Sequence, residues 1–287
     1  MIFQTPSIRL RSFCVAAIST LIAVYGAQAQ DKVINLYSAR HYSTDEALYN
    51  NFTRTTGIKV NRLEGGEDQL LQRIKSEGAN SPADVFLTVD AGRLWIADQE
   101  GVFAPIQSKV LNERIPAAYR LASNTWYGLS TRARVMVVDK LKVKPGEIAT
   151  YEDLADPKWK GQVCTRSGSH VYMLSLISSI IEHAGAEKAE AWAKGVVANL
   201  ARQPKGGDTD QIKAVAAGEC AVALSNSYYI ARMIKSDKAD DRAAMERVRI
   251  VWPNTNGRGV HMNVSGGGVL KYAPNRDNAI KFMEYLV

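Results

Sequence analysis

The chain has 287 residues, of which 46% are hydrophobic and 23% charged, and its formal net charge is +7. The positive charge is spread along the chain and forms no basic stripe interleaved with aromatic residues, so we do not expect a nucleic-acid-binding protein. The length exceeds what one ordinary hydrophobic core needs and therefore predicts two domains.

Residues 1–29 have the pattern of a cleavable secretory signal. Arg9 and Arg11 precede the apolar run FCVAAISTLIAVYGA, and AQA at 27–29 places small residues at a cleavage site. The apolar run is shorter than the ~20 residues that a spanning helix needs, so cleavage after Ala29 is favoured over a membrane anchor. Cleavage removes two arginines and no acidic residue, which lowers the formal charge from +7 to +5.

Two cysteines, Cys164 and Cys220, would remain after cleavage, because Cys14 lies within the signal. An even number of cysteines in an exported protein is typical of a disulfide framework. We expect a disulfide between these two, closing a loop of about 55 residues. The alternative is a pair of buried thiols.

Strands and helices alternate over the first third of the chain. This rhythm predicts an α/β fold with a mostly parallel sheet covered by helices. The 43–57 helix is expected to open on a capping box, Ser43 with Glu46, and to close at Gly57. The segments are the strands VINLYSA (33–39), IKVNRL (58–63) and ADVFLTV (83–89), and the helices STDEALYNNFTRTTG (43–57), EDQLLQRIKSEG (67–78) and AGRLWIADQEG (91–101).

Two extended segments interrupt the later part of the chain, WYGLSTRARVMVVDK (126–140) and RVRIVWPN (247–254). If they cross between lobes in opposite directions, residues 30–131 with 259–287 form a first lobe and residues 132–258 a second. The sequence stops inside the helix RDNAIKFMEYLV without a cap, so we expect a chain truncated at its C-terminus. The segments between the crossings read as the helices HVYMLSLISSIIEHAG (170–185), AEKAEAWAKGVVANLA (186–201) and DQIKAVAAGEC (210–220) and the strand AVALS (221–225).

Four tyrosines, Tyr42, Tyr172, Tyr228 and Tyr229, stand at strand–helix junctions or helix starts. Ser167 or Ser169 is expected to cap the helix of Tyr172. Open α/β sheets bind ligands at this edge, and the positive end of a helix dipole favours an ionised phenol. Phenolate oxygens suit a hard, highly charged cation such as Fe³⁺.

Six motifs in order resemble the periplasmic ferric-iron-binding proteins of bacterial ABC importers, most closely the FutA-type members. They are INLYSARHY, TGIKVNRLEGG, SPADVFLTVDAGRLWIADQEGVFAPI, WYGLSTRARVMVVD, YEDLADPKWKG and ALSNSYYIARM. The resemblance covers residues 33–287 and implies a two-lobed class II periplasmic-binding-protein fold. Each lobe would be a mixed, mostly parallel sheet flanked by helices, with two crossing strands as the hinge. It further implies a periplasmic monomer that closes on Fe³⁺ and delivers it to the permease and ATPase subunits of an importer.

The resemblance also implies the metal ligands, which are His41, Tyr42, Tyr172, Tyr228 and Tyr229. Members of the family with a His, Glu and two Tyr site carry the glutamate where this chain has Val89, and Asp90 comes one residue later. A glutamate-plus-anion site is therefore not expected, and Tyr42 and Tyr172 can replace its donors. Four phenolates on Fe³⁺ leave a charge of −1, which Arg40 or Arg202 is expected to balance.

Two other classes of function fit these residues less well. A solute-binding protein of the same fold could stack a small organic cation or hold an oxyanion, such as a polyamine, thiamine or a phosphonate, but aromatic cages for cations favour Trp and Phe with carboxylates. An enzyme is not expected, because the chain has no nucleophile elbow, HExxH motif or Walker loop. The run SGGGV at 265–269 is interpreted as a tight turn near the rim of the cleft.

Overall fold

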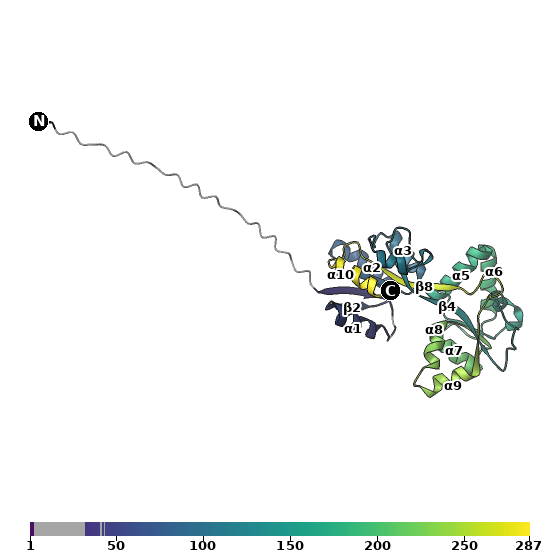
Figure 1. Ribbon diagram of the computed structural model, residues 1–287. Helices are drawn as coiled ribbons and strands as arrows, with labels where there is room; N and C mark the ends of the chain where they lie inside the picture. Colours follow the sequence, from purple (N-terminus) through teal and green to yellow (C-terminus); the bar gives the residue numbers. More distant parts are fainter. Residues whose placement is uncertain (3–31, 41, 43) are drawn as a thin grey trace. The chain divides into compact units, whose positions relative to one another are not determined.

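A single 13-residue strand, β4 (Tyr127–Asp139), joins two groups of strands in the computed structural model, which describes residues 1–2, 32–40, 42 and 44–287. The first part of β4, up to Ala133, pairs with β8 (Met262–Val269). Its last residues pair with β6 (Val222–Asn226) and β7 (Val248–Val251). Figure 1 shows β4 and β8 between the helices labelled α1, α2, α3 and α10 and those labelled α5 to α9.

The strands form a mixed sheet in the order β2-β1-β3-β8-β4-β6-β5, with β7 beside β4. The pairs β1–β2, β1–β3 and β5–β6 are parallel, whereas every pair that includes β4 or β8 is antiparallel. The mixed α/β fold is therefore confirmed, and the crossing strands introduce the antiparallel pairs. The remaining strands are β1 (Val33–Ser38), β2 (Lys59–Glu64), β3 (Val85–Thr88) and β5 (Val163–Cys164).

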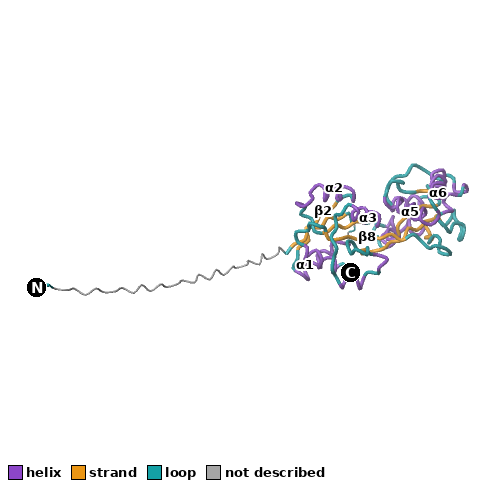
Figure 2. Tube along the Cα trace, turned by 90° about the horizontal axis from the view of Figure 1, so that it is seen from above, coloured by secondary structure: helices purple, strands orange, loops and turns teal. Residues whose placement is uncertain are grey.

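Helices flank the strands, as Figure 2 shows. The buried side chains on them recur at the three- and four-residue spacing of an amphipathic helix, for example Met173, Leu176 and Ile180 on one helix. The helices are α1 (Thr44–Thr56), α2 (Glu67–Glu77), α3 (Ala91–Gln99), α4 (Lys109–Arg114), α5 (Val171–Ala184), α6 (Ala186–Ala198), α7 (Asp208–Ala216), α8 (Ser227–Ile234), α9 (Ala239–Arg247) and α10 (Arg276–Tyr285).

The buried hydrophobic residues separate into clusters that lie on either side of the β4–β8 crossing. Two clusters combine residues of β1, β3 and α10, and of α2 and α3, and we call this part the first lobe. Two others combine residues of α5, α6 and β6, and of α7 and α8, and we call this part the second lobe. Residues Lys32–Val287 together form one compact unit. In the described ranges no helix is both long and apolar enough to cross a membrane.

Two sequence interpretations are corrected by the strand pairing. The segment 247–254 does not cross between lobes, because its strand β7 pairs only with Met136–Asp139 of β4. The return crossing is instead β8, whose Met262 pairs with Ala133 and whose Val269 pairs with Val85 of the first lobe.

The glycine run lies inside strand β8 rather than in a turn. A Cβ on Gly266 would overlap the carbonyl oxygen of Tyr127, and one on Gly268 would overlap that of Thr125. A Cβ on Gly267 would overlap the neighbouring strand β3. Glycine is needed here because the flanking backbones approach the strand closely.

Helix ends follow partly from the predicted signals. Gly57, at φ +71°, ends α1 as expected, and its N–H bonds to the Thr53 carbonyl oxygen. The cap of α5 is His170, whose Nδ1 accepts from the Tyr172 N–H at 3.2 Å, so the predicted serine cap is wrong. The capping residue Ser43 and the signal segment 1–29, apart from its first two residues, lie outside the described residues.

The predicted disulfide between Cys164 and Cys220 is present, with a Cα–Cα distance of 5.9 Å. It ties β5 to the segment that leads from α7 into β6. Both residues are buried beside a hydrophobic cluster of the second lobe.

Candidate functional site

The four predicted tyrosines lie at element boundaries from both lobes. Tyr42 lies in the link between β1 and α1, and Tyr172 is the second residue of α5. Tyr228 and Tyr229 are the second and third residues of α8, directly after strand β6. His41 lies outside the described residues.

Tyr228 contacts each of the other three tyrosines. Its hydroxyl oxygen is 3.2 Å from that of Tyr172. Its ring lies edge-on to Tyr42 with centroids 5.2 Å apart, and its centroid is 4.2 Å from that of Tyr229. The structure therefore gathers all four tyrosines, and the Tyr42–Tyr228 contact joins the first lobe to the second.

Two cavities open on either side of this tyrosine cluster. One of about 290 Å³ is lined by Tyr42 and Tyr228 together with Thr44, Ser130, Thr131, Arg132 and Arg232. The other, of about 200 Å³, is lined by Tyr172 and Tyr229 together with Ala39, Gly65, Gly66, Glu67, Val89, Arg166, His170 and Val171. Residues of both lobes line each cavity.

Burial opposes ionisation of two of these phenols. It raises the pKa of Tyr172 and of Tyr228 above the usual value, because a buried phenolate loses its hydration. The neighbouring tyrosines raise the pKa of Tyr228 further, since two phenolates repel each other. The expectation that the helix start favours the ionised phenol is therefore wrong for the metal-free protein at these two positions.

Arg132 is a buried guanidinium beside the cluster with no hydrogen-bond partner among the described residues. Its side chain is 4% exposed, and all three of its nitrogen atoms lack a partner. Its Cζ lies 5.5 Å from the centroid of the Tyr172 ring, and it lines the cavity with Tyr42 and Tyr228. A buried cation without a partner is unfavourable, so this site is suited to hold negative charge.

The two arginines named from the sequence have different surroundings. Arg40 places its Cζ 4.8 Å from the centroid of the Tyr42 ring, and it makes a bidentate ion pair with Asp45 at 2.7 and 2.9 Å. Arg202 makes an ion pair with Glu219 at 2.8 Å and does not line either cavity of the tyrosine cluster. These contacts give Arg202 a structural role within the second lobe.

A buried carboxylate connects the two tyrosine-bearing helices of the second lobe. Asp208, at 0% exposure, accepts from the Arg134 guanidinium at 2.6 Å and from the N–H of Asn226, the N-cap of α8, at 2.7 Å. Its other oxygen lies 3.4 Å from Arg166, whose Nη2 is 2.7 Å from Nε2 of the α5 cap His170. Asp208 thus fixes the starts of α8 and α5 relative to each other, and with them their phenols.

Val89 and Asp90 have different surroundings. Val89 lines the cavity of Tyr172 and Tyr229, and Asp90 caps α3 by accepting from the N–H groups of Gly92 and Arg93. The carboxylate in this cavity comes instead from Glu67, which accepts from the Val89 N–H at 2.9 Å and from the Thr88 hydroxyl. Burial raises the pKa of Glu67.

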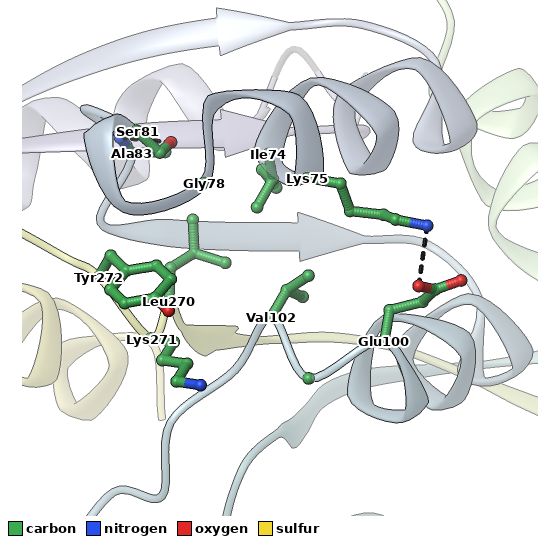
Figure 3. A pocket seen from close by; sticks show the side chains of 11 residues that line it. Ile74, Lys75, Gly78, Ser81, Ala83, Glu100, Val102, Leu270, Lys271 and Tyr272 are labelled. Carbon is green, nitrogen blue, oxygen red and sulfur yellow. Dashed lines mark hydrogen bonds and ion pairs between the residues drawn. The ribbon is translucent and has the colours of Figure 1, made fainter.

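A third cavity, of about 310 Å³, lies in the first lobe and contains none of the four tyrosines (Figure 3). Ile74, Val102 and Leu270 give it an apolar lining, and the Lys75–Glu100 ion pair at 2.8 Å spans its side. It lacks a convergent set of anionic oxygens. Across the part of the chain that the structure describes, no group of three or more His, Cys, Asp or Glu side chains could hold a metal ion.

Several residues of the site were not identified from the sequence, namely Arg132, Arg134, Arg166, His170 and Asp208. A signal existed for the first two. Positions 132 and 134 share one face of a strand, and two arginines on one face of an otherwise apolar strand indicate a buried anionic partner. Both approach Tyr172, at 5.5 and 5.9 Å from its ring centroid.

Comparison with known proteins identifies the family of the chain. Residues 80–287 match the family described as bacterial extracellular solute-binding proteins. Iron uptake protein A1 of Synechocystis sp. is 54% identical over 258 residues, which are 90% of this chain and 72% of that protein. The solved structure of FutA (IdiA) from Trichodesmium in complex with iron and citrate is 58% identical with a TM-score of 0.83, and the match covers 88% of this chain and 80% of that chain. The ferric binding protein from Campylobacter jejuni is 41% identical with a TM-score of 0.86 over 88% and 80% of the two chains. The chain belongs to the bacterial extracellular solute-binding proteins and is a relative of the cyanobacterial iron uptake proteins.

Proposed function

We propose that this protein captures Fe³⁺ in a cleft between its lobes and delivers it to an iron importer. The observation that carries the proposal is the convergence of Tyr42, from the first lobe, with Tyr172, Tyr228 and Tyr229, from the second. Beside them lies the buried Arg132, which has no hydrogen-bond partner among the described residues. Negatively charged phenolate oxygens suit a hard trivalent cation. The relatives with iron in their names support the same cargo.

The electrostatics of the cluster fit a cation that replaces protons. The raised pKa values of Tyr172 and Tyr228 keep both phenols neutral at neutral pH without metal. A bound trivalent cation would lower those pKa values and displace the protons. Four phenolates with Fe³⁺ carry one net negative charge, which the Arg132 guanidinium can balance. Uptake should therefore release protons, and acid should favour release of iron.

The finer parts of the proposal rest on the sequence. His41 is a candidate fifth ligand, and residues 30–131 with 259–287 and residues 132–258 are the proposed lobes that close on the metal. The separate hydrophobic clusters on either side of the crossing strands support a division into two lobes. We place the mature monomer in the periplasm, with the permease and ATPase subunits of an inner-membrane importer as partners.

The test is to add ferric citrate to the purified mature protein and record the visible spectrum. A band from phenolate-to-iron charge transfer is expected in the wild type. Tyr228→Phe should lose most of it, because Tyr228 touches the other three tyrosines. Tyr272→Phe is the matched control, since Tyr272 is half exposed and lines the distant cavity of Figure 3.

A colourless protein that retains no iron by elemental analysis would overturn the proposal. Binding of spermidine, thiamine or a phosphonate by calorimetry, with no iron band, would instead support a solute-binding protein for an organic cation or oxyanion.

A further inference from the structure

The side-chain amide of Asn263 links the two lobes at the crossing strands. Asn263 lies in β8 and is 7% exposed. Its Nδ2 donates to the Asp90 carboxylate, the cap of first-lobe helix α3, at 2.6 Å. The same Nδ2 donates to the hydroxyl of Ser175, on second-lobe helix α5, also at 2.6 Å. One amide group therefore bonds to a helix of each lobe.

The carbonyl oxygen of the same amide is also used. Oδ1 accepts from the Ala91 N–H at 3.2 Å and from its neighbour's N–H, that of Val264, at 2.7 Å. A carboxamide is the neutral side chain that can donate twice and accept twice at one point. With both ends bonded, the amide has a single orientation.

This linkage lies next to the tyrosine cluster. Ser175 follows Tyr172 by three residues on α5, so both lie on the same face of that helix. Asn263 pairs across the sheet with Arg132, whose guanidinium approaches the Tyr172 ring. The Ser175 hydroxyl also lies 3.0 Å from His261 Nε2.

We propose that Asn263 is a positioning residue that latches α5 to α3, so that Tyr172 stays within reach of the first-lobe ligand Tyr42 and the cleft stays closed on its cargo. This inference rests on the proposed iron-binding function. The latch acts through the position of a helix and not through contact with the metal. Its loss should shorten the time for which iron is held while leaving the ligand set intact.

The chain offers a matched pair of substitutions on one helix. Ser175→Ala removes the second-lobe partner of the latch. Ser179→Ala, one turn further along α5, removes a hydroxyl that donates to the Leu176 carbonyl oxygen of its own helix at 2.7 Å. Asn263→Ala removes the centre of the latch, and Ser175→Ala carries the test if that variant does not fold.

Two measurements on mature protein test the latch. The first is the rate at which the visible iron band decays when excess EDTA is added to protein loaded with ferric citrate. The second is the radius of gyration by small-angle X-ray scattering, with and without iron. We expect Ser175→Ala and Asn263→Ala to show the wild-type band, to lose it about ten-fold faster, and to be more open. The double variant should resemble either single variant, and Ser179→Ala should match the wild type.

The outcomes separate this inference from the proposed function. If the wild type shows the band but Ser175→Ala loses iron no faster than Ser179→Ala, or has the same radius, the latch is wrong and the function stands. If the wild type shows no band, the function fails, and the radii of the metal-free variants decide the latch. A larger radius for Ser175→Ala than for Ser179→Ala then supports it, and equal radii overturn it.

Discussion

Replacing Asp208 by asparagine should destabilise the second lobe more than any surface charge change. Asp208 is fully buried, and its partner Arg134 is 2% exposed. The asparagine keeps the shape of the side chain but leaves the buried guanidinium without a countercharge. Removing one partner of a buried ion pair costs about 3–5 kcal/mol.

Urea unfolding followed by far-ultraviolet circular dichroism measures this loss. With a denaturant slope of about 3 kcal/mol per molar, the midpoint should fall by about 1–1.7 M. Asp277→Asn is the matched control. Asp277 and Asp208 both lie in the first turn of a helix, α10 and α7, but Asp277 is exposed. Loss of a helix-dipole contact alone costs about 0.3–1 kcal/mol, so the control should shift the midpoint by less than about 0.3 M.

In the same variant the tyrosine side chains at the starts of α5 and α8 should be held less firmly in position. The Asn226 N–H that bonds to Asp208 begins the helix of Tyr228, and Arg166 links Asp208 to the cap of α5. Iron-loaded Asp208→Asn should therefore show a weaker visible band than Asp277→Asn. If the two variants unfold at the same urea concentration, the assignment of Asp208 as the central support of this lobe is wrong.

Three further substitutions have expected outcomes. Arg132→Met should raise the free energy of unfolding of the iron-free protein by about 1–2 kcal/mol, since it removes an unpaired buried charge. The same substitution should also speed iron loss to EDTA at least about ten-fold. A more stable iron-free protein that holds iron less well would show that Arg132 balances charge at the site and does not merely fill space. Burial lowers the pKa of His261 from 6.5 to about 4, with Arg134 and Arg132 adding to the effect. The unfolded chain then binds the extra proton, so this contribution to stability is complete above about pH 6.5 and is lost as the pH falls toward 4. Urea titrations at both ends of that range should show a loss of up to about 3 kcal/mol that His261→Gln reduces, and an equal loss in the variant would contradict it. Replacing Cys164 and Cys220 by alanine together should lower the free energy of unfolding by about 4 kcal/mol, given their separation of 56 residues, and an unchanged urea midpoint would argue against a stabilising disulfide.

The sequence indicates candidate site residues where a suitable residue type stands at a junction between a strand and a helix. Tyr228 and Tyr229 stand together directly after an apolar strand, and adjacent side chains can face one region only where the strand gives way to a helix. Val89 stands where related sites carry a glutamate, and a carboxylate in its cavity comes from Glu67, which the sequence did not single out. The order of strands and helices likewise indicates the α/β fold, because the longer helices show their own period.

Other features depend on neighbours that are distant in the sequence. His170 caps α5 through its Nδ1, although two serines beside it gave the stronger local signal. The glycine run of β8 has the composition of a turn. The neighbouring strands β3 and β4, which are distant in the sequence, show that it lies inside a strand. Asp208 shows no local pattern, since its partners come from β4, from the N-cap of α8 and from the loop before α5.

The place of β8 in the sheet affects the order in which the two lobes can be completed during synthesis. Strand β8 lies between β3 and β4, although it comes more than 120 residues after β4 begins. A chain that emerges from its N-terminus therefore completes the second lobe's sheet before the first lobe has its central strand. The first lobe to be synthesised is the last to finish folding, and no single cut in the chain divides the molecule into two halves that could each fold alone.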